Sequence, residues 1–470
     1  MVLMAAPMRR ADPETQPADH ARPTPAQVTA LLLLAGLAAW TVNLAIFWLS
    51  GPPLGHDEAQ YTIAARDLLN GEEQRWFYLS TGTSLLAIPG LLAGGSEVAL
   101  RTPTFVLGIG FGLVVVTLAW RYFGAATAAW VAAILGGMRG FTKVGPQLLS
   151  DLPAATCLLA GTLVIVSEVT REDGPRWRAV LAAPLLAAAL YLRYASCVPI
   201  AILGAAALGF GLRSIARRPA PIVATAALFL ALLVPHAVAA TRATGWPLGV
   251  LLASKDVPQH TWIAEGLVDY VAVNPVRTYG LLAPLVLIAG LLAGLRLRDR
   301  RAKVLWTVAV LDIVAIGLVT HAQTRYISYG LALLVVLGTD VLRRWIAARS
   351  PRARAAIGAT AAIAMAVTWV LIARVQGRAE DSRAASLRTR LDAAALIRAD
   401  AAGAPCLVVG DPFTQLEWYS GCRGATWPWD DLGRARIYLY YRPEDPPRET
   451  RGRPQVLFAR RDAIVTRYDP

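Results

Sequence analysis

The stretch "QVTALLLLAGLAAWTVNLAIFWLSGPPLGHDEAQYTIAARDLLNG", residues 27–71, joins a long apolar run directly to an acidic segment. The run from Gln27 to Ser50 is long enough to cross a bilayer as a helix. It lacks the small-residue cleavage site of a secretory signal, so we predict a retained membrane helix. Asp57 and Glu58 follow where the chain leaves the hydrocarbon. The stretch therefore predicts a membrane protein with acidic groups at one membrane boundary.

Apolar runs of spanning length recur along the chain, which has 470 residues and is 56% hydrophobic. The span-length rule gives about eleven crossings, each an apolar run bounded by charged or polar loops. We therefore predict an all-α polytopic membrane protein. The predicted spans are residues 27–50, 100–120, 125–141, 152–169, 179–191, 198–212, 222–239, 279–295, 304–320, 327–342 and 355–373.

The net charge of +14 indicates how the chain is oriented across the membrane and does not predict nucleic-acid binding. The arginines cluster in short segments between alternate spans, as the positive-inside rule predicts for cytoplasmic loops. The N-terminal tail, residues 1–26, falls on the same side. We expect the other loops and the tail to face outward, namely residues 51–97, 142–151, 240–278, 321–326 and 376–470.

The C-terminal part, residues 376–470, has no spanning run. Its pattern predicts a small extracytoplasmic α/β domain with an amphipathic helix, a short buried strand, a second helix and later strands in "ARIYLYY" and "PQVLFAR". Cys406 and Cys422 both belong to this domain, where an oxidising compartment would allow a disulfide. Cys157 and Cys197 lie in apolar spans and are expected to be packing residues.

The acids at positions 57, 58 and 151 allow two interpretations. Asp57 could cap the helix that follows it, with Glu58 favourable in the first turn. Asp151, in "SDLP", could likewise cap its own span. Both aspartates nevertheless fall at the same predicted membrane boundary, so they could also contribute to one polar site there.

Cationic and proton-active side chains occupy the same boundary layer. Charged groups near hydrocarbon are costly, so they usually face a wet cavity or one another. Each one alone could simply snorkel from a helix end to the interface. Together with the acids, they predict a polar site at the outer face. The candidates are Lys143, Arg193, Arg242, Lys255, His321 and Arg325.

A site facing both lipid and water suits the transfer of a sugar from a lipid phosphate. The phosphate leaving group is a weak base that needs no general acid, and cations can stabilise its developing charge. Only the acceptor hydroxyl needs a base, which one carboxylate within hydrogen-bond reach can supply. A carboxylate beside Arg or Lys is what this boundary layer offers.

The order of motifs resembles the C-type fold (GT-C) glycosyltransferases, within the branch of protein O-mannosyltransferases and lipid A aminoarabinose transferases. The resemblance covers residues 27–375 and rests on the Asp-Glu pair after the first span, "SEVALRTPTFVLG", "SDLP", "TGWPL" and the late "RYISY". It implies a GT-C catalytic domain over these residues, with residues 51–97 as its outer loop. It also implies a polyprenyl-phosphate-linked sugar donor.

The resemblance implies roles for individual residues. Asp57 matches the general base, Glu58 its catalytic neighbour and Asp151 the second acid. The aminoarabinose branch often carries Lys-Pro-Pro where this chain has "YLSTGTSLLAIPG", so other cations must hold the donor phosphate. The phosphate-binding candidates are Arg193, Arg325, Lys143, Arg242 and Lys255, and the substrate-binding candidates are His56, Tyr61, His321 and Tyr326.

We therefore expect a glycosyltransferase at the outer face of a bacterial cytoplasmic membrane, with a glycan, lipid or protein acceptor. No cofactor is required, although Asp57 and Asp151 could together bind a divalent metal. The alternative is a membrane transporter or lipid flippase. That alternative favours inverted repeats and midplane charges, whereas this chain has no convincing repeat and gathers its charges at one face.

Overall fold

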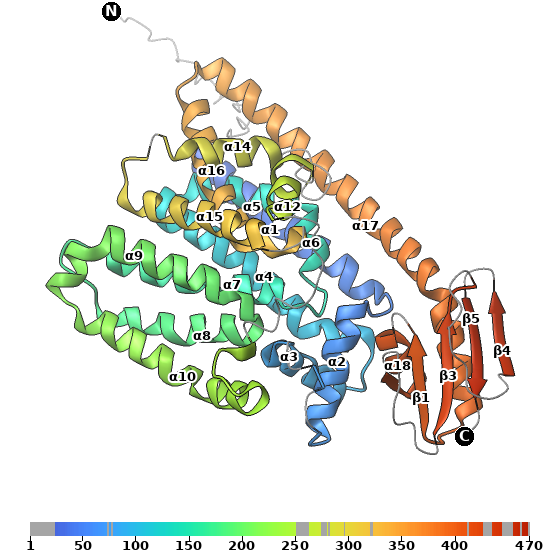
Figure 1. Ribbon diagram of the computed structural model, residues 1–470. Helices are drawn as coiled ribbons and strands as arrows, with labels where there is room; N and C mark the ends of the chain where they lie inside the picture. The colour runs from blue at the N-terminus through green and yellow to red at the C-terminus, as the bar shows by residue number, and fades with distance from the viewer. Residues whose placement is uncertain are drawn as a thin grey trace, which may run out of the picture.

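The computed structural model describes residues 24–72, 75–76, 79–250, 263–273, 280, 283–295, 297–319, 323–410, 413–425, 435–443, 455–460 and 463–468. Two of the predicted site residues, Lys255 and His321, lie outside this described part. The described residues form a large helical bundle with a small sheet beside it (Figure 1).

The bundle is built from long helices joined by short connections and single helical turns. Its elements are α1 (Pro25–Ser50), α2 (His56–Leu69), α3 (Thr81–Leu92), α4 (Glu97–Phe123), α5 (Ala125–Gly136), α6 (Arg139–Val144), α7 (Asp151–Val169), η1 (Trp177–Leu181), α8 (Ala182–Leu192), η2 (Tyr194–Ser196), α9 (Cys197–Arg217), α10 (Ala220–Thr244), α12 (Glu265–Val268), η4 (Asp269–Val273), α14 (Ala283–Ala293), α15 (Arg300–Val319), η5 (Thr324–Ile327), α16 (Ser328–Ala347) and α17 (Pro351–Ala401).

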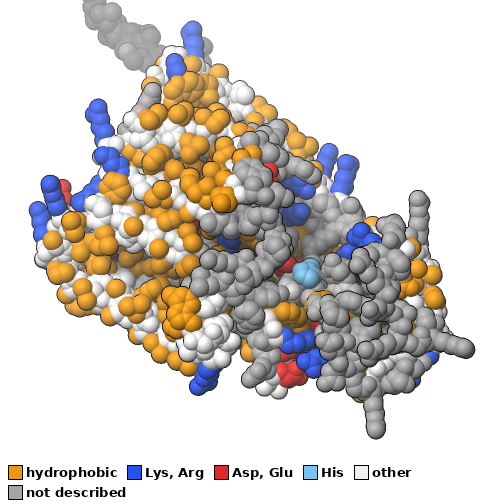
Figure 2. All heavy atoms as spheres, in the orientation of Figure 1, with side chains coloured by type: hydrophobic (Ala, Val, Ile, Leu, Met, Phe, Trp, Pro, Cys, Tyr) orange, Lys and Arg blue, Asp and Glu red, His pale blue; other side chains and the backbone are white. Residues whose placement is uncertain are grey.

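Each predicted span overlaps at least one of these helices. Among the described residues, seven helical segments are long and apolar enough to cross a membrane, and shorter apolar helices accompany them. Hydrophobic side chains cover much of the visible surface of the bundle, and Lys and Arg gather towards its edges (Figure 2). The prediction of an all-α polytopic membrane protein is confirmed.

Close helix packing sets the centre of the bundle. Gly36 of α1 faces α5 so closely that a Cβ atom there would lie 2.5 Å from the backbone of Ala132. The indole of Trp40 donates to the carbonyl of Gly108 in α4 at 3.1 Å. Small residues at helix contacts let the backbones approach, and buried polar side chains then bond across the helices. These contacts hold α1 against α4 and α5.

A single long helix joins the bundle to the C-terminal domain. Helix α17 runs for 51 residues and crosses Figure 1 as a continuous diagonal. The predicted last span and the predicted amphipathic helix after it are therefore one element. Proline occurs only at the first position, Pro351, where it favours helix initiation, and the rest of the segment has no proline to break it.

The C-terminal domain is a five-stranded sheet in the order β2-β1-β3-β5-β4. Strands β1, β2 and β3 are parallel, whereas β5 pairs antiparallel with β3 and β4. Ile397 near the end of α17 packs into a core with Val408 and Tyr438, which confirms the predicted small α/β domain. Its elements are β1 (Cys406–Gly410), α18 (Phe413–Ser420), β2 (Arg423–Ala425), β3 (Arg436–Tyr441), β4 (Gln455–Arg460) and β5 (Ala463–Tyr468).

A disulfide joins Cys406 and Cys422, whose Cα atoms are 4.9 Å apart. It connects the start of β1 to the residue just before β2. The intervening loop contains α18, so the bond encloses the helix that faces the membrane bundle.

Candidate active site

Asp57 is not the residue that caps the N-terminus of α2. Gly55 is the N-cap residue, and its backbone N–H donates to Glu58 Oε2 at 2.8 Å. Asp57 lies in the first turn, where the helix dipole favours a negative charge. The interpretation of Asp57 as the N-cap is therefore wrong, because the neighbouring Glu58 already satisfies the backbone there. The Asp57 side chain is 39% exposed and pairs with Arg325.

Arg325 brings the two predicted aspartates together. Its Nη2 donates to Asp57 Oδ2 at 2.6 Å, and its Nε lies 3.4 Å from Asp151 Oδ2. Arg325 comes from η5, the single turn that precedes α16. Asp151, in the first turn of α7, is only 3% exposed. One guanidinium thus links an exposed carboxylate to a buried one.

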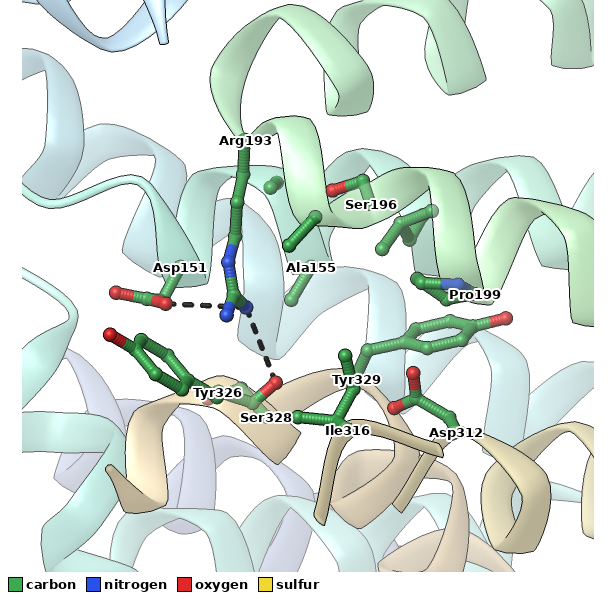
Figure 3. Close-up of a pocket in the computed structure, with 13 residues that line it drawn as sticks. Asp151, Ala155, Arg193, Ser196, Pro199, Asp312, Ile316, Tyr326, Ser328 and Tyr329 are labelled. Atoms are coloured by element: carbon green, nitrogen blue, oxygen red, sulfur yellow. Dashed lines mark hydrogen bonds and ion pairs between the residues drawn. The ribbon is translucent and has the colours of Figure 1, made fainter. Parts of the chain in front are cut away.

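Arg193 approaches Asp151 from the other side. Its Nη1 lies 3.2 Å from Asp151 Oδ1 and donates to the backbone carbonyl of Tyr326 at 3.2 Å (Figure 3). The guanidinium carbon also lies 4.5 Å from the centre of the Tyr326 ring. Arg193 directly follows α8 and has extended backbone, so the helix ends before η2 begins. This interruption of the helix lets the Arg193 side chain reach between Asp151 and Tyr326.

Glu58 lies behind this cluster in a buried ion pair with Arg101. Arg101 Nε and Nη2 donate to Glu58 Oε1 and Oε2 at 2.7 and 2.9 Å. The backbone N–H of Leu148 also donates to Glu58 Oε1, at 3.1 Å. Both side chains are almost fully buried. This geometry supports a positioning role for Glu58 instead of the predicted catalytic one. Sequence reasoning missed Arg101, although an arginine inside the apolar segment "SEVALRTPTFVLG" was a detectable signal.

Tyr61 and His56 border the acid cluster on α2. The Tyr61 hydroxyl is hydrogen-bonded to Ser150 and Ser80, and burial raises the pKa of this phenol above its usual 10.0. The neutral phenol can therefore act as a hydrogen-bond donor near both aspartates. His56 Nδ1 lies 2.8 Å from the hydroxyl of Thr414 in α18. His56 is thus engaged by the C-terminal domain at the rim of the site.

Lys143 and Arg242 are the two remaining predicted cations that the structure describes. Lys143 lies exposed in α6, a helix that contacts η5. Arg242 is exposed in the last turn of α10 and borders a shallow surface groove with Val234 and Val238. Within the described part of the chain, Arg242 forms no ion pair with either aspartate. Arg193 and Arg325 are thus two predicted phosphate-binding residues that the structure places in ion pairs with the predicted aspartates.

A narrow polar cavity extends from Asp151 into the bundle. Its free volume is about 10 Å³, which is room for one water molecule. Asp312 of α15 lies at its far end beside Tyr329 (Figure 3). Asp312 Oδ2 accepts from the backbone N–H of Gly330 at 3.1 Å. An acid within a predicted span was a signal that sequence reasoning missed. The cavity has no room for a sugar ring, whereas the Asp57 side chain is partly exposed.

The residues present do not fit a chelated metal ion. Asp57 and Asp151 share the guanidinium of Arg325, and Arg193 adds a second positive charge, so the four groups are close to neutral. A divalent cation would lack the excess negative charge that usually attracts it. Across the described residues, no three His, Cys, Asp or Glu side chains gather in a metal-binding arrangement.

Comparison with known proteins finds a sequence match to one protein family and similar folds among solved structures. A model of the dolichyl-phosphate-mannose-protein mannosyltransferase family matches residues 83–238. No curated protein sequence matches the chain significantly.

Solved structures extend the likeness to nearly the whole chain. Crystal structures of ArnT from Cupriavidus metallidurans, in the apo state and bound to undecaprenyl phosphate, are similar to it with a TM-score of 0.67. They share 13% and 15% sequence identity with 94% of this chain, over 97% and 98% of their own length.

The oligosaccharyltransferase AglB from Archaeoglobus fulgidus, in complex with an inhibitory peptide and a dolichol-phosphate, has a TM-score of 0.60 and 14% identity. The match covers 85% of this chain and 64% of AglB. At such low identities the likeness concerns the fold. The chain therefore adopts the GT-C fold of membrane glycosyltransferases.

Proposed function

We propose that this protein transfers a sugar from a polyprenyl-phosphate donor to an acceptor at the outer face of a bacterial cytoplasmic membrane. One observation carries the proposal: Arg325 contacts both the exposed Asp57 and the buried Asp151. The undecaprenyl phosphate bound by ArnT and the dolichol-phosphate bound by AglB support a lipid phosphate as part of the donor. The mannosyltransferase family match supports a sugar as the transferred group.

Asp57 is the general base in this proposal. Its carboxylate accepts the proton of an acceptor hydroxyl while that oxygen forms a bond to the anomeric carbon of the sugar. The bond between the anomeric carbon and the phosphate oxygen breaks, and the polyprenyl phosphate leaves with the electron pair. A direct displacement of this kind inverts the anomeric configuration. The exposure of Asp57 supports this role, because an acceptor from the aqueous side can reach it.

Arg193 and Arg325 hold the donor phosphate. A guanidinium presents several N–H donors in a plane and matches phosphate oxygens well. Asp151 is buried against both arginines and orients them toward the site. When the phosphate engages Arg325, it competes with Asp57 for the same donors, which leaves the Asp57 carboxylate available to accept a proton. Donor binding thereby activates the base.

No metal takes part in this proposal, because two guanidinium groups supply the positive charge near the phosphate. Chelating agents should leave turnover unchanged. A requirement for an added divalent cation would contradict this part of the proposal.

The test uses the full-length protein in lipid nanodiscs with a panel of labelled polyprenyl-phosphate sugars and a bacterial envelope extract as acceptor. We expect one donor to be consumed with transfer of label to the extract. Asp57→Asn should lower turnover by about 100-fold or more while donor binding persists. Asp173→Asn, which removes an exposed acid paired with Arg171, is the matched control and should keep full turnover. Near-normal turnover in Asp57→Asn would refute the assignment of the base.

A further inference from the structure

A second charged cavity lies at the other end of the helices that carry the candidate active site. Its free volume is about 60 Å³. Helix α7 starts at Asp151 and ends at Val169, close to this cavity. Its 19 residues span about 28 Å, which is close to the thickness of the hydrocarbon core. The cavity is lined by Arg121, Tyr122, Ser167, Glu168, Arg171, Arg176, Arg178 and Arg301.

Positive charge dominates this arginine cavity. Five of its lining residues are arginines, and the one lining acid, Glu168, accepts a hydrogen bond from the backbone N–H of Arg176 at 2.8 Å. Asp173 pairs with Arg171 through two hydrogen bonds of 3.0 and 2.9 Å, and its Oδ2 lies 3.4 Å from Nη2 of a second lining arginine, Arg176. Among the residues that the structure describes, no carboxylate forms an ion pair with the other three lining arginines. These are Arg121, Arg178 and Arg301.

The walls of the cavity are held by contacts between α4, α7 and α15. The Tyr122 hydroxyl in α4 is hydrogen-bonded to the Leu163 carbonyl and lies 3.0 Å from the Ser167 hydroxyl, both in α7. Arg301, in α15, donates from Nε to Thr170 Oγ1 at 3.3 Å, and its guanidinium carbon lies 5.9 Å from the centre of the Tyr122 ring. The cavity is thus formed between three helices and the segment from Arg171 to Arg178 that follows α7.

Exposed tryptophans adjoin the arginines. Trp120 is 54% exposed and directly precedes Arg121, and Trp177 is 66% exposed between Arg176 and Arg178. Tryptophan favours the region between hydrocarbon and headgroups. The two tryptophans therefore favour a position of the arginine cavity at headgroup depth and add apolar surface beside it.

We propose that the arginine cavity binds the phosphate of an anionic phospholipid headgroup. Basic pockets between membrane helices suit such headgroups, because guanidinium groups and phosphate oxygens form charge-assisted hydrogen bonds. The positive-inside rule explains why arginines occur at this membrane face, but it does not require them to converge on one cavity. The apolar surface at the two tryptophans favours a lipid over free phosphate.

The first test compares full-length protein in nanodiscs of phosphatidylcholine with and without phosphatidylglycerol. Native mass spectrometry should detect retained phosphatidylglycerol, and melting temperature should rise with its content. Inorganic phosphate, added to protein in phosphatidylcholine, should give little stabilisation. Equal retention of both lipids, or stabilisation by inorganic phosphate alone, would overturn the lipid assignment. The wild-type protein suffices for this test, so it does not depend on a variant that folds.

Two triple variants distinguish lipid binding in the arginine cavity from general attraction of anionic lipid to a basic surface. The variant R121Q/R178Q/R301Q should retain about tenfold less phosphatidylglycerol. The matched control R213Q/R352Q/R354Q removes three exposed arginines at the same membrane face, at the end of α9 and the start of α17, and should retain nearly as much as wild type. Equal losses in both variants would contradict a specific site. Lipid retention is measured without sugar transfer, so this result is independent of the proposed glycosyltransferase activity.

Discussion

The hydroxyl of Thr414 in the C-terminal domain lies 2.8 Å from Nδ1 of His56, the residue directly before the proposed base. Two further contacts reach the same segment: Gln415 donates to the Leu54 carbonyl at 2.8 Å, and the Leu54 N–H donates to the Tyr419 hydroxyl at 2.8 Å. Helix α18 thus contacts Leu54, which precedes α2, and His56, the first residue of α2. The C-terminal domain thereby constrains the direction in which Asp57 points.

Replacing Thr414 with valine should lower turnover without weakening donor binding. The change removes the hydroxyl's contacts with the ring and the backbone carbonyl of His56, a net loss of about 1 kcal/mol in positioning, or about fivefold in rate. Steady-state rates and lipid-donor binding would separate the two effects. Thr117→Val is the control, because the Thr117 hydroxyl donates to Leu113 within its own helix. Unchanged turnover in Thr414→Val would argue against positioning of Asp57 by α18.

Removing the disulfide should loosen the C-terminal domain. Cys406 and Cys422 are 16 positions apart, and closing a loop of this length stabilises a fold by about 3 kcal/mol. The double variant C406S/C422S should therefore unfold its C-terminal domain at lower denaturant concentration and lose turnover with it. A reductant should lower the denaturant concentration at which the wild-type domain unfolds, but it should not change the unfolding of the double variant. Cys157→Ala, at a free thiol of α7, controls for loss of a cysteine.

The Glu58–Arg101 pair should matter for stability more than for chemistry. Glu58→Gln leaves Arg101 buried with a weakened partner and should cost about 3 kcal/mol of unfolding free energy. The double variant Glu58→Gln/Arg101→Met removes the unpaired charge and should recover part of the loss. Folded Glu58→Gln protein, isolated by size exclusion, should retain most turnover per molecule. A loss as severe as that of Asp57→Asn would instead make Glu58 catalytic.

The C-terminal domain should lose stability at high pH through Tyr438. Its hydroxyl donates to Asp400 at 2.7 Å, and burial, together with this hydrogen bond to a carboxylate, raises the pKa of Tyr438 to about 12. A raised pKa favours the protonated fold, so this contribution is complete below pH 10.0 and disappears as the pH rises toward about 12. Tyr438→Phe should be less stable than wild type at pH 8 by about 1 kcal/mol. Denaturant unfolding should give a smaller difference near pH 12; a constant difference would contradict the titration.

The spans, the helix after the first span and the small α/β domain could all be predicted from local sequence. Hydropathy and strand or helix periodicity depend on neighbours a few residues away, so the run from Gln27 to Ser50 needs no tertiary context to be interpreted. The continuity of α17 across the predicted domain boundary near residue 376 was not predicted, because a change in composition does not by itself end a helix.

The sequence by itself also predicted that Asp57 and Asp151 lie at one membrane boundary, because span lengths place both acids at corresponding ends of their helices. Only the tertiary structure decided which cations meet them. Arg325 and Arg193 reach Asp151, Arg242 does not, and Glu58 turns inward to Arg101. The physical reason is that hydropathy sets one coordinate, the depth, whereas lateral neighbours depend on how the helices pack against one another, which close contacts such as that at Gly36 determine.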